Sequence, residues 1–132
     1  MYKVLKIHKH TATSFIDLLN IDTGTQDKCF DDSSVVSLKN FAFIKEGGVY
    51  DCKMELFGEF TNQKTDSSVE VTIVETNVII GKTKYLKVLI GSDVYHILES
   101  DAKGLKLRRI MNYSFSRKDL IQVNDVIHAD CL

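Results

Sequence analysis

The residues best suited to binding chemistry form one basic segment, residues 103–118, which reads KGLKLRRIMNYSFSRK and contains no acid. Tyr113 and Phe115 alternate with polar residues between its two groups of cations. Single-stranded nucleic acid is bound by this combination, because cations follow the phosphates and rings stack on the bases. The alternative is that both rings pack in the core and the cations only solvate an outer face. The cations are Lys103, Lys106, Arg108, Arg109, Arg117 and Lys118.

A second basic group begins at the turn GKTK, residues 81–84, and continues through Tyr85 to Lys87. Phe57 falls on the polar side of an alternating stretch, residues 48–60, where an exposed ring would serve as a stacking platform. We predict that the turn and Phe57 border the same groove as the basic segment. The predicted nucleic-acid-binding residues are Phe57, Lys82, Lys84, Tyr85, Lys87, Lys106, Arg108, Arg109, Tyr113, Arg117 and Lys118.

No sequence motif indicates an enzyme. The chain has no phosphate-binding glycine loop, no GxSxG elbow and no Cys–His pair within a recognisable local motif. Asp31 and Asp32 are adjacent, so in an extended chain they point to opposite faces, which suits solvated charges better than an acid–base pair. His8 and His10 would share a strand face and bind zinc, but no CxxC or HExxH spacing accompanies them. The prediction is a non-enzymatic protein without a metal or another cofactor.

Charges are divided unevenly along the chain, although the formal net charge is only −1. Residues 12–76 contain twelve Asp or Glu and five Lys or Arg, a net of −7. Residues 77–118 contain three acids and nine bases, a net of +6. Such asymmetry either gives a nearly neutral protein one basic surface or is neutralised between faces after folding, and both interpretations stay open.

Length and composition are those of one soluble globular domain, residues 1–132, with 44% hydrophobic and 27% charged residues. Apolar runs are only a few residues long, which excludes a transmembrane helix. The N-terminal MYKVLKIHKH lacks the continuous apolar stretch of a secretory signal. Three widely spaced cysteines, Cys29, Cys52 and Cys131, do not form a disulfide framework. We therefore predict a cytoplasmic protein with no membrane partner.

The element expected to position these residues is the stretch GVYDCKMELFGEF, residues 48–60. Apolar and charged residues alternate along it, which predicts a long β-strand with one buried face. Gly58 interrupts that face, and a glycine inside a strand marks a bulge or a sharp bend of the kind that a small barrel needs. The apolar residues of the strand are Tyr50, Cys52, Met54, Leu56 and Phe60.

Shorter alternating stretches before and after this strand predict seven to nine strands in all. One of them, residues 69–80, changes phase midway and therefore predicts a bulge. Gly91 and Ser92 suit a two-residue type II′ hairpin that places Leu86 opposite Ile97. The expected strands outside the central one are 2–9, 14–21, 69–80, 85–90, 94–98 and 107–115.

The remaining segments are predicted as loops or have two interpretations. The polar residues 26–34 and 62–68 indicate loops. Residues 33–41 fit one helical turn followed by an extended segment 41–44, or two short strand pieces. Near the end, Ser116 and Asp119 fit the capping box of a short helix, whereas VNDVI fits a strand, turn and strand that close a barrel.

The whole pattern predicts an all-β fold, namely a small five-stranded barrel with extra N-terminal strands and one short helix at most. Residues 41–129 resemble the OB-fold, the oligonucleotide-binding barrel, in the segment FIKEGGVYDCKMELFGEF, the GS hairpin and the late VNDVI. The family type that the chain resembles is the compact OB-fold proteins of phages and plasmids that coat single-stranded DNA. This resemblance implies a concave strand face and loop mouths that hold a short stretch of nucleic acid.

The predicted function is non-enzymatic binding of single-stranded nucleic acid, most simply DNA, with little sequence preference. The acidic residues 12–76 support the alternative of an interaction or assembly module, such as a phage structural protein or an inhibitor of a host enzyme. Such a module would form a homo-oligomer or bind one protein partner.

Overall fold

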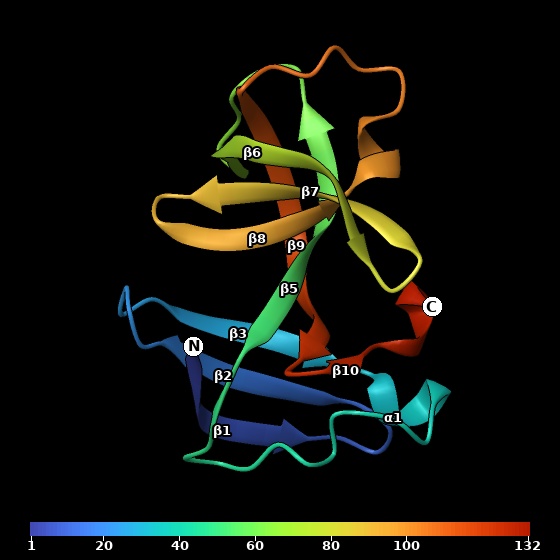
Figure 1. The fold of residues 1–132 in the computed structure, drawn as a ribbon. Helices are drawn as coiled ribbons and strands as arrows, with labels where there is room; N and C mark the ends of the chain where they lie inside the picture. The colour runs from blue at the N-terminus through green and yellow to red at the C-terminus, as the bar shows by residue number, and fades with distance from the viewer.

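Five strands close into a small β-barrel in the computed structural model, which describes residues 1–132 (Figure 1). Around the barrel β9 is followed by β5, β8, β7 and β6, and β6 pairs with β9 to close the ring. Strands contain 58% of the residues, so the predicted all-β class with a small barrel is confirmed. The barrel strands are β5 (Cys52–Thr61), β6 (Ser68–Ile80), β7 (Thr83–Ile90), β8 (Asp93–Leu98) and β9 (Ile110–Val123).

Three N-terminal strands extend the same sheet beyond the barrel. β1 (Tyr2–Lys9), β2 (Ser14–Asn20) and β3 (Gln26–Asp31) form an antiparallel meander, and β3 joins β9 in parallel. The two-residue strands β4 (Val49–Tyr50) and β10 (Val126–Ile127) pair with β1 and β9. Helical segments are short: α1 (Ser33–Val36) and the 3₁₀ turns η1 (Glu99–Ala102) and η2 (Ala129–Cys131). Figure 1 shows the barrel above the N-terminal sheet, with β5 and β9 passing between them.

The pairing order of the barrel is compatible with an OB-like fold. β6, β7 and β8 form an antiparallel meander, and its third strand runs parallel to β5 at Glu55 and His96. β9 is antiparallel to both β5 and β6. OB barrels have the same pairing scheme, with the strand equivalent to β5 at the end of the chain order. Here that strand precedes the meander, so the barrel is a cyclic permutation of the OB order.

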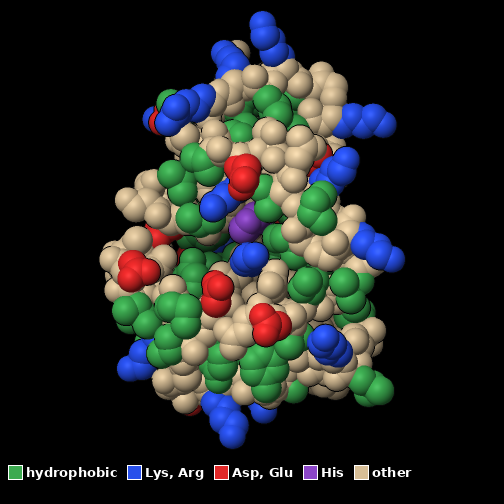
Figure 2. Space-filling view, in the orientation of Figure 1, with side chains coloured by type: hydrophobic (Ala, Val, Ile, Leu, Met, Phe, Trp, Pro, Cys, Tyr) green, Lys and Arg blue, Asp and Glu red, His purple; other side chains and the backbone are tan.

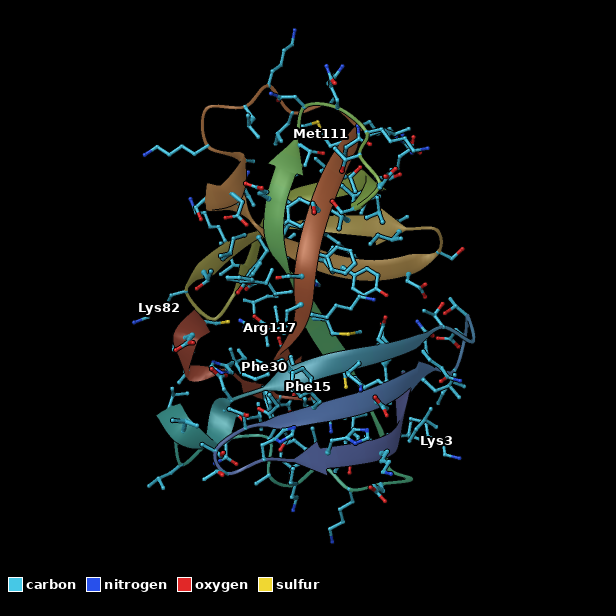
Figure 3. All side chains as sticks on the ribbon, turned by 180° about the vertical axis from the view of Figure 1, so that it is seen from behind. Lys3, Phe15, Phe30, Lys82, Met111 and Arg117 are labelled. Carbon is cyan, nitrogen blue, oxygen red and sulfur yellow. The ribbon has the colours of Figure 1, made fainter.

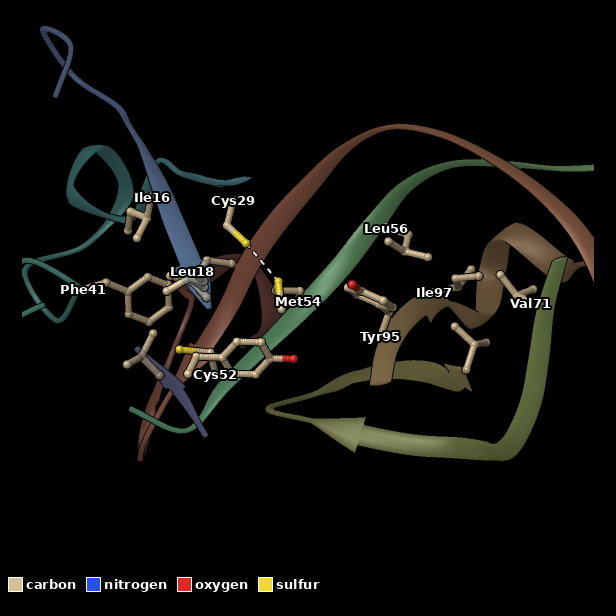
Figure 4. Packing of buried hydrophobic residues seen from close by; sticks show 14 of the residues in the cluster. Ile16, Leu18, Cys29, Phe41, Cys52, Met54, Leu56, Val71, Tyr95 and Ile97 are labelled. Carbon is tan, nitrogen blue, oxygen red and sulfur yellow. Dashed lines mark hydrogen bonds between the residues drawn. The ribbon is translucent and has the colours of Figure 1, made fainter. Parts of the chain in front are cut away.

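One hydrophobic core runs from the N-terminal sheet into the barrel (Figure 4). Met54 lies at the junction, because its side chain is buried and its sulfur is 2.9 Å from Sγ of Cys29 on β3. A second, smaller cluster of Ile80, Tyr85 and Ile121 packs around Cys131 of η2. Residues of the main core include Ile16, Leu18, Cys29, Phe41, Cys52, Met54, Leu56, Val71, Tyr95 and Ile97.

Gly58 has the bend-forming role that the sequence predicted. The pairing of β5 with β9 shifts register between Phe57 and Gly58. A Cβ atom on Gly58 would lie 1.9 Å from the carbonyl oxygen of Ser114, so the two backbones approach more closely than any side chain permits. The resulting bulge bends β5 where it enters the barrel.

Two further local predictions are confirmed. The register of β6 on β7 shifts between Ile73 and Val78, as the phase change of residues 69–80 indicated. In the β7–β8 hairpin Leu86 is paired with Ile97. Gly91 has a φ of +60°, which the first central residue of a type II′ turn requires.

Two local predictions are wrong. Residues 26–34 are not a loop throughout, since Gln26–Asp31 form β3, in which the acidic Asp27 faces inward. The segment 41–44 is a turn and not an extended piece, although the helical turn before it is present as α1. Of the two interpretations of the C-terminal end, the strand–turn–strand is the one observed, because β9 continues through Ser116 to Val123 and then turns into β10.

Candidate nucleic-acid interface

Two adjoining cavities form one groove on the outer surface of the barrel. The first, of about 270 Å³, is lined by residues of β5, β7, β9 and η2. The second, of about 520 Å³, is lined by the start of β7, the end of β8, η1 and the segment after η1. Thr83 and Leu98 line both cavities, so the two cavities adjoin. Phe57 and Arg117 line its first part, and Lys84 and Lys103 line its second part.

Arg117 is held between two phenylalanine rings. Its guanidinium carbon lies 4.6 Å from the ring centre of Phe30 and 4.7 Å from that of Phe57. Asp119 fixes the guanidinium in plane, since Nε and Nη2 donate to its two carboxylate oxygens at 2.5 and 3.1 Å. The ring centre of Phe15 lies 5.4 Å from that of Phe30, so Phe15, Phe30, Arg117 and Phe57 form a row of side chains. Figure 3 shows Phe15, Phe30 and Arg117 following one another across the strands.

This row remains accessible to a ligand. Phe57 is 50% exposed, and the Arg117 side chain is 38% exposed. Phe15 and Phe30 are half-buried. The cation and the rings come from four strands, because Phe15 lies on β2, Phe30 on β3, Arg117 on β9 and Phe57 on β5. The arrangement therefore offers flat faces and ring edges of the kind on which nucleobases stack.

The floor of the first cavity is polar. The hydroxyl of Tyr85 donates to Oε1 of Glu55 at 2.9 Å and lies 3.3 Å from Sγ of Cys131. Burial raises the pKa of the Glu55 carboxyl above its usual value, although the hydrogen bond from Tyr85 acts in the opposite direction. Carboxylates at a cavity floor repel phosphates and accept hydrogen bonds from amino groups, so this part of the groove suits a base better than a backbone.

Asp32, His128 and Asp130 line the same cavity and offer ligand atoms within 4.8 Å of one another. Nδ1 of His128 accepts the backbone N–H of Asp130 at 3.0 Å, which leaves the ring proton on Nε2. Nε2 lies 2.6 Å from Oδ1 of Asp32. Both ring nitrogens are therefore engaged within the protein, and the three residues act as a clamp that ties η2 to the end of β3.

Lysines lie along the rim of the groove. Lys82 and Lys84 are exposed on and after the β6–β7 turn, and the backbone N–H of Lys82 donates to the carbonyl of Cys131 at 2.6 Å. Gly81 permits this contact, because its φ is +63° and a Cβ atom would lie 2.4 Å from the Cys131 carbonyl oxygen. The turn is thus packed directly against η2, with its lysines free in solvent.

The structure brings together only some of the predicted binding residues. Phe57 and Arg117 meet across β5 and β9, and Lys84 lines the same groove, whereas Lys82 is exposed on the adjoining turn and lines neither cavity. Three further cations, on the segment between η1 and β9, are exposed but do not line it. Figure 3 shows Met111, just beyond that segment, at the far end of the barrel from Arg117. These cations are Lys106, Arg108 and Arg109.

The prediction is wrong for three of the binding residues, because two are core residues and the third is paired within the protein. Tyr85 and Tyr113 are 2% and 0% exposed, so neither ring can stack on a base. Lys118 is paired with the buried Asp27, which also accepts a hydrogen bond from the hydroxyl of Tyr95 at 2.7 Å. The physical reasons differ: Tyr113 points into the main core, Tyr85 packs against Cys131 of η2, and Lys118 is held by the carboxylate of Asp27 on β3. Lys87 lies in a different cavity.

Phe15, Phe30 and Glu55 are residues of the site that the sequence did not indicate. Phe30 follows Cys29 in a stretch that reads as a polar loop, and only the weak alternation of Asp27 and Cys29 with exposed residues signals a strand there. Glu55 lies on the charged side of the central strand, as its position predicts, but that side is covered by Tyr85 and η2.

Comparison of the chain with protein-family models, with curated proteins and with solved structures gave no match. None of the helices has the length and apolar character needed to cross a membrane. The class of the molecule is therefore defined by its own geometry, a closed five-stranded β-barrel with an N-terminal sheet and one grooved outer face.

Proposed function

We propose that the protein binds single-stranded nucleic acid along the groove and catalyses no reaction. The observation that supports this most is that Phe57 and Arg117 line one cavity of the groove and Lys84 and Lys103 line the cavity that adjoins it. An arginine flanked by rings provides stacking faces for bases, and lysines along a rim neutralise phosphates. In this arrangement bases enter the first cavity and the backbone follows the lysines.

The position of the groove on the barrel supports the same function. OB barrels bind oligonucleotides over the second and third strands and the loop between the first two. Their counterparts here are β7 and β8, which contribute Thr83, Lys84 and Leu98 to the groove, and the β6–β7 turn, which leads directly into Thr83. A relation to the single-stranded DNA-binding proteins of phages and plasmids is part of this proposal. So is a cytoplasmic location, which suits three free, buried cysteines.

Fluorescence anisotropy with labelled single-stranded DNA, single-stranded RNA and duplex DNA across a salt series tests the proposal. Single strands are expected to bind, with the logarithm of the association constant falling linearly with the logarithm of salt concentration. Phe57→Ala is expected to weaken binding by about 1–3 kcal/mol, the contribution of one stacked base. Phe43→Ala is the matched control, because Phe43 is 40% exposed and lines no part of the groove.

The rim is tested by a charge-removing double variant. Lys84→Gln with Lys103→Gln removes two expected phosphate contacts, so the salt slope should fall by about 1.4 for a single strand. Lys39→Gln with Lys45→Gln removes the same charge from exposed residues outside the groove and should leave the slope unchanged. No binding at low salt, or equal slopes for both double variants, would overturn the proposal.

A second candidate function is assembly into a homo-oligomer. Val35, Val36 and Leu38 are exposed by 59%, 45% and 103%, and they form an apolar strip on and after α1. Light scattering coupled to gel filtration distinguishes the two functions. Two results together would favour assembly over binding of single strands: the protein forms an oligomer that Leu38→Lys dissociates, and it does not bind nucleic acid.

A further inference from the structure

Glu55 lines the first cavity of the groove, and one of its carboxylate oxygens has no partner in the protein. The residue is only 9% exposed, and the hydroxyl of Tyr85 donates to Oε1 at 2.9 Å. The buried side-chain polar atoms that lack a hydrogen bond are Oγ1 of Thr61 and Nδ1 of His96. Oε2 of Glu55 is not among them, so this oxygen is accessible from the cavity. An acceptor that is open only toward a cavity is a contact point for a hydrogen-bond donor of a ligand.

The negative charge of Glu55 is not paired within the protein, because the residue takes part in none of the ion pairs of the structure. Its cross-strand neighbour on β9 is Asp119, and like charges in directly opposite positions destabilise a sheet. Asp119 is bound by the guanidinium of Arg117, and the carboxylate of Asp32 is bound by Nε2 of His128. Glu55 is thus the buried carboxylate that a donor from a ligand would stabilise.

Arg117 supplies a donor in the same cavity. Its Nε and Nη2 donate to the two oxygens of Asp119, which leaves Nη1 available to a ligand. Burial raises the pKa of Glu55, and the positive charge of Arg117 is one of the influences that lower it, so the two groups act on the same space. The cavity therefore presents a donor and a buried carboxylate acceptor to whatever enters it.

The overall charge of this cavity selects which part of a strand can enter. Four carboxylates line it against one arginine, and the carboxylate that belongs to neither a pair nor the floor, Asp130, is 73% exposed. Phosphates are repelled by this excess, whereas an electropositive base edge is attracted. By contrast, acidic and basic side chains are interspersed around the histidine near the centre of Figure 2. The excess of carboxylates is thus a local property of the first cavity.

We propose that the first cavity selects guanine among the bases of a bound single strand, through Glu55 and Arg117. The Watson–Crick edge of guanine carries the acceptor O6 and, beside it, two donors, N1–H and the N2 amino group. Nη1 of Arg117 donates to O6, and the carboxylate of Glu55 accepts from both donors. This inference rests on the proposed function, because the base reaches the cavity as part of a strand held in the groove.

The other bases do not match this pair of side chains. Adenine and cytosine each place one amino group beside a ring-nitrogen acceptor, which a carboxylate repels. Thymine and uracil have a single N–H between two carbonyl oxygens. An ionised carboxylate has acceptors only, and the hydrogen bond from Tyr85 favours that form of Glu55. Guanine is therefore the base that gives Glu55 two donors.

Fluorescence anisotropy with labelled oligothymidines of equal length, each with one central guanine, adenine or cytosine, tests the selection. The guanine strand is expected to bind about tenfold more tightly than the others, the discrimination typical of one bidentate contact. Hypoxanthine in place of guanine lacks the N2 amino group and should lose most of this advantage. 7-Deazaguanine keeps the whole Watson–Crick edge and should retain it. Equal binding of the guanine and hypoxanthine strands would contradict the proposal.

Glu55→Gln replaces one acceptor oxygen by a donor and should abolish the preference for guanine. The variant should bind plain oligothymidine with wild-type affinity, which also shows that it is folded. Glu59→Gln is the matched control, because Glu59 is exposed on the same strand and lines neither cavity of the groove, so the preference should persist.

The possible outcomes separate this inference from the proposed function. Salt-dependent binding of all strands with equal affinity, or an unchanged guanine preference in Glu55→Gln, would overturn the inference and leave the proposed function in place. Loss of oligothymidine binding in Glu55→Gln would assign Glu55 a structural role instead of a selective one. Absence of binding to every strand at low salt would overturn both.

Discussion

Lys118 forms an ion pair with the buried Asp27, and this pair determines what Lys118 contributes to the protein. The Asp27 side chain is 2% exposed, and the Lys118 side chain that pairs with it is 19% exposed. The ammonium group also lies 4.9 Å from the ring centre of Tyr95 and 5.4 Å from that of Phe115. A cation so enclosed has its charge neutralised within the protein, so it contributes little to binding of an external phosphate.

Lys118→Met should therefore destabilise the protein without weakening nucleic-acid binding. Removing one partner of a buried ion pair costs about 3–5 kcal/mol, because the remaining charge stays desolvated. Urea denaturation measures the loss, and Lys28→Met, at an exposed position next to Asp27, is the control. A variant with wild-type stability and weakened binding would restore Lys118 as a phosphate contact.

His96 gives the stability of the protein a pH dependence of definite sign. Because the pKa of His96 is lowered from 6.5 to about 4, the unfolded chain takes up a proton that the folded protein does not between these pH values. Stability is therefore unaffected above about pH 6.5 and falls as the pH decreases toward 4, by roughly 3 kcal/mol in total. Glu55 has the opposite effect on stability. Because burial raises its pKa, its contribution to stability decreases as the pH rises above the pKa of the unfolded chain.

His96→Gln isolates this contribution, because Glu55 is present in both proteins and its effect cancels in the difference. The unfolding free energy of wild type minus that of the variant should decrease by roughly 3 kcal/mol between pH 7 and pH 4. Denaturant titrations at several pH values measure it. The same experiment on a variant of the exposed His10 is the control, and a pH-independent difference for His96→Gln would contradict the prediction.

At the scale of elements, strands with simple alternation were predictable and strands with inward-facing polar residues were not. The central strand and the β7–β8 hairpin have apolar residues on one face, so their sequence alone determines which side is buried. β3 was not predicted, because its inward-facing residues are Asp27 and Cys29. An aspartate in a sequence indicates an exposed position, so the alternation of this strand was not recognised. Its burial depends on Lys118 and Tyr95, which come from strands far along the chain.

Gly58→Ala tests the bend in β5. The added methyl group would meet the Ser114 backbone at 1.9 Å, so the strands must separate or shift register. Strain of this kind costs about 1–3 kcal/mol, and here it falls on backbone atoms that cannot rotate away. Thermal and urea unfolding measure the effect. Glu59→Ala, at the exposed neighbouring position, should be close to neutral, and equal stability of the two variants would show that the bulge adapts.

At the scale of the whole molecule, the groove could be predicted only in part. Phe57 and the cations near it were recognisable by type, but their convergence depends on the pairing of β5 with β9, whose segments lie about sixty residues apart in the sequence. Phe30 joins Arg117 only because β3 runs parallel to β9 over a short contact of two residue pairs. Neither contact leaves a pattern in the sequence, because each strand satisfies its own alternation equally well with other partners.

The continuous core predicts that the N-terminal sheet and the barrel unfold together. Met54 is 1% exposed and contacts Cys29 of the N-terminal sheet, while its neighbour Leu56 lies in the same core beside the barrel strands. Met54→Ala leaves a cavity at this junction and should cost about 2–5 kcal/mol.

Hydrogen exchange measures the loss separately for amides in the two parts, for example at Leu18 in β2 and Val88 in β7. Both should lose the same free energy, because a shared core couples their opening. Leu5→Ala, at a position 39% exposed on β1, is the control and should have a small effect. If Met54→Ala lowered protection only in the N-terminal sheet, the barrel would be an independent cooperative unit, and the sheet would be an appendage that the barrel does not need in order to fold.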